Sequence, residues 1–204
     1  MNNDLAEILR FAATNDALFA DLAAFYARLD RTIDSYRPTC WNKGACCKFG
    51  EFGHRLYVTA IELAYFVREQ RGSWLGANGA AACPYQVEGQ CTARAARPMG
   101  CRVFFCDPAA EHWQNPVYEC YLGELKAIGE RHGVPYRYME WLSALASVGS
   151  TELSILSREA GNAGETAGSP TAGADKRSDD TTATAGSVDP KRSNVIELPQ
   201  VRES

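Results

Sequence analysis

Residues 40–47 read CWNKGACC, and residues 83–106 read CPYQVEGQCTARAARPMGCRVFFC. These two stretches hold seven of the eight cysteines in the 204-residue chain, and the eighth is Cys120. Glycine and proline interrupt both stretches, so we expect loops in which several thiols converge. The plain alternative is that the cysteines act as small apolar core residues. Cysteines used as filler would not cluster beside Gly and Pro, so the sequence favours a fold organised around the thiols.

The charge and hydropathy of the chain exclude two classes of partner. A net charge of −4 and a pI near 5.5 leave no basic surface of the kind that binds nucleic acid. Asp4, Glu7 and Arg10 interrupt the N-terminal stretch where a signal peptide needs apolar residues. No segment has about 18 uncharged apolar residues in a row, so we expect a cytoplasmic protein without a membrane span.

In a reducing compartment, clustered cysteines bind metal or do redox chemistry more often than they form disulfides. The expected metal ligands are Cys40, Cys46, Cys47, Cys83, Cys91, Cys101 and Cys106. Their spacing matches neither paired zinc-finger arms nor the common ferredoxin run. The side chains of Cys46 and Cys47 leave the backbone in different directions. These two thiols therefore serve different sites, or one of them binds metal while the other packs.

The spacing of the cysteines resembles a known family. Its signature CxxCxxCC is similar to Cys40-x2-Lys43-x2-Cys46-Cys47, and its second half is similar to Cys83-Pro84, Gly89-x-Cys91, Arg97-Pro98-x2-Cys101-Arg102 and Phe105-Cys106. The family is that of the YkgJ-like cysteine-cluster proteins, and the resemblance covers about residues 39–107. It implies a zinc- or iron-chelating domain. Members are often described as iron–sulfur oxidoreductases, and one branch is similar to flagellin lysine methylases.

One position departs from the family pattern, because Lys43 stands where the family has its second cysteine. Three explanations are open: Cys120 supplies the missing ligand, a site is left open, or only the second group binds metal. Cys120 is either a ligand or a buried structural thiol. His54 is either a fourth ligand of the first group or a surface histidine held by a hydrogen bond.

Arg97 and Arg102 flank Cys101, and both match the family pattern. Cations near thiolates lower their pKa and offset the negative charge of a cluster, so both arginines are expected to support the cofactor. The alternative is a pair of ordinary surface salt bridges. On the first interpretation, Arg102→Ala should weaken metal retention.

The remaining chain predicts a small, mainly helical domain. We expect helices over residues 4–36 (split by a cap at Asn15 or Asp16), 60–71, 116–131 and 136–148, with a short helical continuation to 157, and a strand over 55–58. Thr59 and Glu62 have capping-box spacing, and Asp107-Pro108 is a helix-start pair.

The composition changes near residue 158, where Gly, Ala, Ser, Thr and Asp take over. Residues 1–157 are therefore predicted to form the metal-binding domain, and residues 158–204 a disordered tail. Val195, Ile196 and Leu198 are either a docking peptide or part of an unremarkable tail.

Three functions agree with this pattern. The first is a redox or electron-transfer protein with an iron–sulfur cluster, which an all-thiolate ligand set with loosely spaced members favours. The second is a zinc module that holds a surface for a protein partner. The third is a methylase-like enzyme with an open coordination position. The sequence has no glycine-rich phosphate loop, G-x-S-x-G or HExxH, so it contains no familiar catalytic motif besides the thiols.

Overall fold

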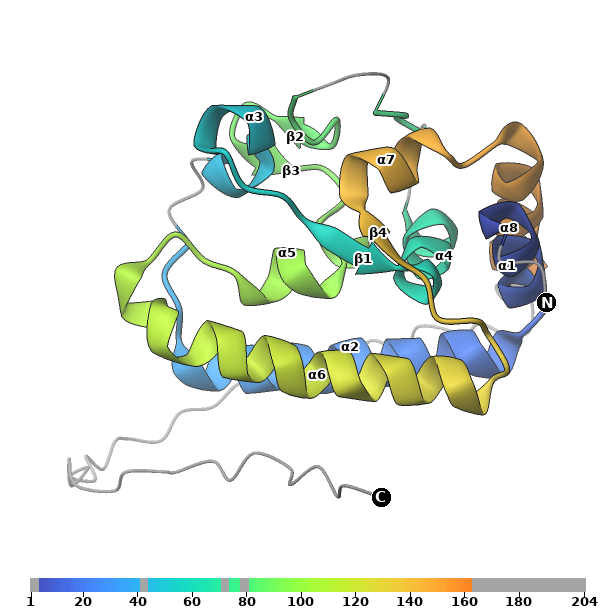
Figure 1. The fold of residues 1–204 in the computed structure, drawn as a ribbon, viewed down its shortest axis with the longest axis horizontal. Helices are drawn as coiled ribbons and strands as arrows, with labels where there is room; N and C mark the ends of the chain where they lie inside the picture. The colour runs from blue at the N-terminus through green and yellow to red at the C-terminus, as the bar shows by residue number, and fades with distance from the viewer. Residues whose placement is uncertain (1–3, 41–43, 71–73, 78–80, 163–204) are drawn as a thin grey trace, which may run out of the picture.

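A computed structural model describes residues 4–40, 44–70, 74–77 and 81–162 (Figure 1). Trp41, Asn42, Lys43 and residues 163–204 of the predicted tail, which include Val195, Ile196 and Leu198, lie outside these residues. The first five residues of the predicted tail, 158–162, are helical and belong to the last helix, α8 (Ser150–Asn162), so the predicted boundary at 157 is too early. The helices are α1 (Leu5–Ala13), α2 (Asp16–Tyr36), α3 (Phe49–Phe52), α4 (Ala60–Glu69), α5 (Met99–Val103), α6 (Glu111–Arg131), α7 (Trp141–Ala146) and α8 (Ser150–Asn162). Short 3₁₀ turns lie at Ala45–Cys47, Arg94–Ala96 and Pro108–Ala110, and the strands are β1 (Tyr57–Thr59), β2 (Gln86–Val87), β3 (Gln90–Cys91) and β4 (Tyr138–Glu140). The prediction of a mainly helical fold is confirmed.

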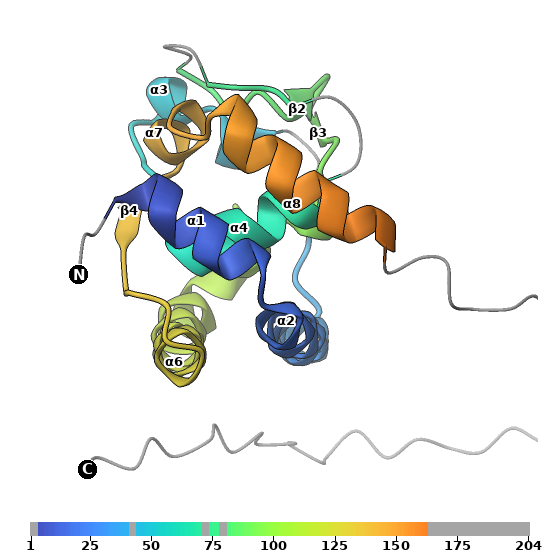
Figure 2. The ribbon, with the colours of Figure 1, turned by 90° about the vertical axis from the view of Figure 1, so that its right-hand side faces the viewer.

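The long helices α2 and α6 run antiparallel along one side of the molecule (Figures 1 and 2). The side chain of Asn15 accepts a hydrogen bond from the Leu18 amide at 3.0 Å, which confirms the predicted split between the first two helices. Apolar residues of α2 recur at helical spacing and are buried, and Phe25 meets Tyr121 of α6 edge to face at 5.6 Å. The apolar stripe on α2 is therefore a core face.

Helix α4 lies at the centre of the fold, between the α2–α6 pair and the cysteine-rich loops. Its N-terminus carries the predicted capping box, in which the side chains of Thr59 and Glu62 each accept from the other's backbone amide. Residues Ala60–Val67 are all buried, because α1 and α8 cover the helix on one side (Figure 2). A helix buried on every face needs neighbours on every side, and α1 and α8 are two of these neighbours.

The structure corrects the predicted helix over 136–148. Residues 138–140 form β4, which pairs antiparallel with β1 in the register Val58↔Met139, and the helix begins only at Trp141. The Glu140 side chain caps it by accepting from the Leu142 and Ser143 amides. Pairing with a distant strand overrides local helical preference, and a sequence window does not contain that partner. Helix α6 also starts earlier than predicted, at Glu111, and α8 extends past residue 157.

None of the helices in the described part of the chain is both long and apolar enough to cross a membrane.

Candidate metal centre

Six of the eight cysteines line one small cavity of about 60 Å³ between the two cysteine-rich loops. They are Cys40, Cys46, Cys47, Cys83, Cys91 and Cys101, and we call this space the cysteine cavity. Residues separated by up to about 60 positions in the sequence thus meet at one point. No disulfide joins any two of them within the described residues.

Tight backbone turns bring the two loops together. Gly44 adopts a left-handed conformation with φ of 65°, which any other residue would adopt only at a cost, and the 3₁₀ turn at Ala45–Cys47 follows it. A Cβ atom at Gly44 would lie only 3.0 Å from Cα of Gly89 in the β2–β3 hairpin. The amide of Cys83 donates to the carbonyl of Cys47 at 2.8 Å, which ties the first loop to the second. Glycine is therefore required where the loops approach each other.

Three of the thiols share hydrogen bonds. The Sγ atoms of Cys46 and Cys47 lie 3.9 Å apart, and Cys47 also contacts the thiol of Cys83. Donation from Cys47 lowers the pKa of Cys46 to about 6 and that of Cys83 to about 7, while the pKa of Cys47 itself is raised. Cys46 and Cys83 therefore ionise near neutral pH, and the thiolate is the form that binds metal.

The thiols of Cys91 and Cys101 are harder to ionise. Burial raises the pKa of Cys91 and raises that of Cys101 well above its ordinary value. Arg97 also lines the cavity, and its positive charge lowers the pKa of both Cys91 and Cys101, against the effect of burial. Burial lowers the pKa of Arg97 itself. A cation that binds here would have to displace the thiol protons, so its affinity should rise with pH.

Aromatic residues close the inner end of the cysteine cavity. The indole N–H of Trp141 donates to Sγ of buried Cys83 at 3.5 Å. Phe66 meets both Trp141 and Tyr85 edge to face, with ring centroids 4.8 and 5.0 Å apart. Hydrogen bonds to ligand sulfur and an apolar surround are the features that tune a metal centre. Sequence analysis did not identify Trp141 as part of this site, because it lies far along the chain from the cysteines.

The thiols line the cavity, but their positions do not form a complete metal-binding site. Within the described residues, no group of three or more His, Cys, Asp or Glu side chains is arranged to hold one metal ion. The donor set itself fits a thiophilic group, since every metal-ligating side chain that lines the cavity is a cysteine. Cys46 and Cys47 both line this one cavity, with Sγ atoms 3.9 Å apart, although the sequence predicted that the two thiols serve different sites or that one of them packs.

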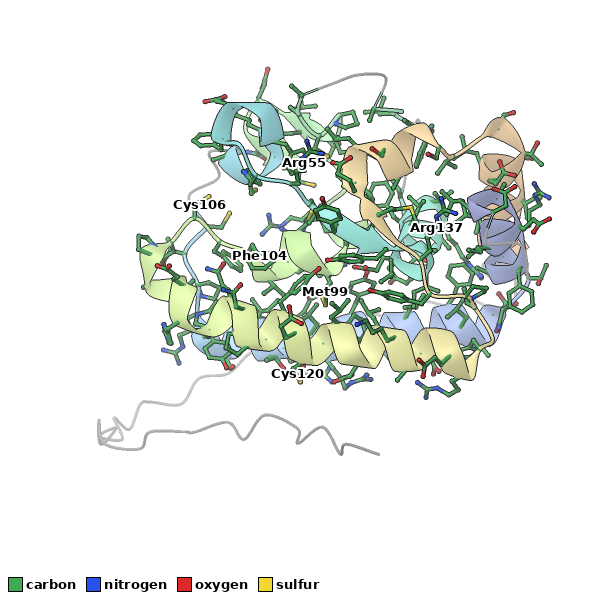
Figure 3. All side chains as sticks on the ribbon, in the orientation of Figure 1. Arg55, Met99, Phe104, Cys106, Cys120 and Arg137 are labelled. Carbon is green, nitrogen blue, oxygen red and sulfur yellow. The ribbon has the colours of Figure 1, made fainter. Side chains whose placement is uncertain are left out.

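Two cysteines lie elsewhere. Cys106 follows α5 and lines a neighbouring groove rather than the cysteine cavity, while Cys120 lies on the far side of α6 (Figure 3). Of the three explanations for Lys43, ligation by Cys120 therefore finds no support in this geometry. His54 is exposed, and its Nε2 lies 3.2 Å from the carbonyl oxygen of Cys46. It thus supports the first loop from outside the cavity.

The two arginines beside Cys101 differ in position. Arg97 lines the cysteine cavity, whereas the buried guanidinium of Arg102 pairs with Asp30 at 2.7 Å and lies over the ring of Tyr26. Its Nε also donates to the Arg97 carbonyl at 2.7 Å. Arg102 therefore anchors the loop that carries Arg97 to α2, and its effect on the thiols is indirect.

Comparison with family models, with curated proteins and with solved structures found no match for this chain. Membership of the YkgJ-like family stays a prediction from the cysteine spacing.

Proposed function

We propose that the protein binds a metal centre in the cysteine cavity and that the centre is an iron–sulfur cluster with a redox or electron-transfer role. The observation that carries the proposal is that six thiols from two distant loops line one small cavity. The thiols that would hold the centre are those of Cys46, Cys47, Cys83, Cys91 and Cys101, with Cys40 at the same cavity. Such a centre would supply one-electron chemistry.

Zinc is the second candidate, because four thiolates also form a structural zinc site. The cavity joins loops that have little regular structure of their own, and a zinc ion there would hold them in place. Four thiolates hold a zinc ion and four also hold an iron–sulfur cluster, so the number of thiols does not separate the two candidates. We rank the cluster first because the thiols are loosely spaced along the sequence. The aromatic inner wall suits either metal.

Purification without oxygen, a visible spectrum, and counts of iron, sulfide and zinc per chain test the proposal. Broad visible absorption with iron and sulfide supports a cluster, and a colourless protein with stoichiometric zinc supports the second candidate. Exposed Cys46 is the best residue to change, because Cys46→Ser leaves the core intact. We expect this variant to lose metal, whereas Cys120→Ser, on the far side of α6, keeps it.

A folded protein that carries no metal, or equal metal content in both variants, would contradict the proposal.

A further inference from the structure

A second cavity lies directly beside the cysteine cavity. It has a volume of about 690 Å³ and opens between the segment that contains α3 and β1 on one side and α5 with α6 on the other. This volume lies in the range of small-molecule sites, about 300–1,000 Å³. Its aromatic lining residues are Phe49, Phe52, Tyr57, Phe104, Phe105, Tyr118 and Tyr138. We call it the aromatic groove.

Several of these aromatic side chains are exposed although they are large and apolar. Phe52 is 56% exposed, Tyr57 is 40% exposed, and Phe104 and Tyr138 are each 39% exposed. Contiguous exposed aromatic residues mark binding surfaces more often than chance, because burying them in the core would stabilise the fold more. The rings present flat faces: Tyr57 and Tyr138 stack at 5.4 Å with an interplanar angle of 22°.

Hydrogen bonds hold the walls in place. The hydroxyl groups of Tyr118 on α6 and Tyr138 on β4 lie 2.6 Å apart. The side chain of buried Gln114 bonds both to the amide and to the carbonyl of Phe105, at 3.3 and 3.2 Å. The groove is therefore formed before any ligand arrives, which reduces the entropy cost of binding.

The charges around the groove favour an anion. Arg55 is the one Arg or Lys side chain among the described residues that line it, and no Asp or Glu accompanies it there. Arg55 is exposed, and within the described part of the chain it makes no hydrogen bond or ion pair. Figure 3 shows it on the segment before β1, across from Phe104. A guanidinium in this state matches a carboxylate, which it binds through two parallel hydrogen bonds.

The two cavities share part of their walls. Cys46 and Cys101 line both the cysteine cavity and the aromatic groove, and Cys106 lines the groove alone. A molecule in the groove would thus contact the same thiols that the metal centre would use.

We propose that the aromatic groove binds a small planar aromatic carboxylate, whose ring lies among the aromatic walls and whose carboxylate pairs with Arg55. Binding itself does not depend on the metal. Its role as the molecule on which the centre acts rests on the proposed function.

The test uses the full chain as isolated, with its metal content measured on the same sample. 2-Naphthoate is the probe, 2-naphthylmethanol is the uncharged comparison, and calorimetry gives both affinities. We expect naphthoate to bind about tenfold more tightly than the alcohol, a difference that Arg55→Gln removes. Arg31→Gln is the matched control, because Arg31 is an exposed arginine on α2 that lines neither cavity.

Three results would overturn the proposal. They are the absence of naphthoate binding, equal effects of the two arginine variants, and a dimer that Tyr138→Ser dissociates, which would make the groove an interface between copies. Because metal is counted separately, naphthoate binding to a protein without metal would refute the metal centre and leave the groove standing. A protein that contains metal but does not bind naphthoate would refute the proposal for the groove and leave the metal centre standing.

Discussion

The Glu62 carboxylate lies buried where two helices begin. One of its oxygens accepts from the Thr59 amide at 2.8 Å, and the other accepts from the Met99 amide at 2.8 Å. It therefore fixes the start of α5, and with it Cys101, relative to α4. Burial raises the pKa of this carboxyl above its ordinary value of 4.5.

This raised pKa gives stability a definite dependence on pH. Between 4.5 and the folded-state pKa, the folded chain binds more protons at Glu62 than the unfolded chain, so the free energy of unfolding falls as pH rises. In the Glu62→Gln variant, we expect the free energy of unfolding to show no such fall over this pH range. Urea denaturation across pH 4–7 for both proteins measures it, with Glu119→Gln as the exposed control. Parallel curves for the parent and Glu62→Gln would refute the expectation.

Trp141 carries a second prediction. Replacement by phenylalanine keeps most of the aromatic wall and removes the N–H donor to Cys83. Loss of a hydrogen bond to a ligand should lower zinc affinity by about tenfold. Competition with a chromogenic chelator measures this affinity. Trp113→Phe is the control, since Trp113 is also buried but stacks on Tyr36 away from the cavity, and equal affinities in the two variants would exclude the role.

The paired helices α2 and α6 form the base on which the loops rest. Leu125 of α6 is completely buried in the core, so Leu125→Ala should cost about 2–5 kcal/mol of stability through lost contacts and the cavity left behind. Leu75→Ala, at a residue 38% exposed, should change stability by less than about 0.5 kcal/mol. Denaturant unfolding compares the two variants. A small loss at Leu125 would mean that α6 is not part of the cooperative core.

The strand pair β1–β4 has a different origin from the helices. Each strand has only three residues, and its partner lies about 80 positions away in the sequence. The pair places Trp141 at the first position of α7, directly after β4, where its indole reaches Cys83. A short strand thus positions a residue of the candidate centre.

At the scale of the whole molecule, the cysteine cavity joins two loops that have little regular structure of their own. A metal bound there would favour the folded chain by mass action, by about 2.7 kcal/mol at 100 times its dissociation constant. We therefore expect the unfolding midpoint to rise with buffered zinc concentration in the parent and in Cys120→Ser. Cys46→Ser should show a much smaller rise. Midpoints that do not change with zinc in any of the three proteins would argue against a structural link between metal and fold.

The sequence alone determined the helices whose signals are local. The cap at Asn15, the capping box of Thr59 and Glu62, and the apolar stripe on α2 each lie within a few residues, and the structure confirms all three. It also predicted that thiols from two distant loops would gather, because cysteines clustered beside Gly and Pro have few other uses. The metal itself stays a prediction.

Only the tertiary structure decided which residues accompany those thiols. Cys106 lines the aromatic groove rather than the cysteine cavity, and Cys120 lies on the far side of α6 (Figure 3). Trp141 joins the thiols of the cavity, and the aromatic groove with Arg55 lies beside them. The physical reason is distance along the chain. Helix periodicity and capping depend on neighbours in sequence, whereas the cavity and the β1–β4 pair depend on contacts between segments that meet only after the core has formed.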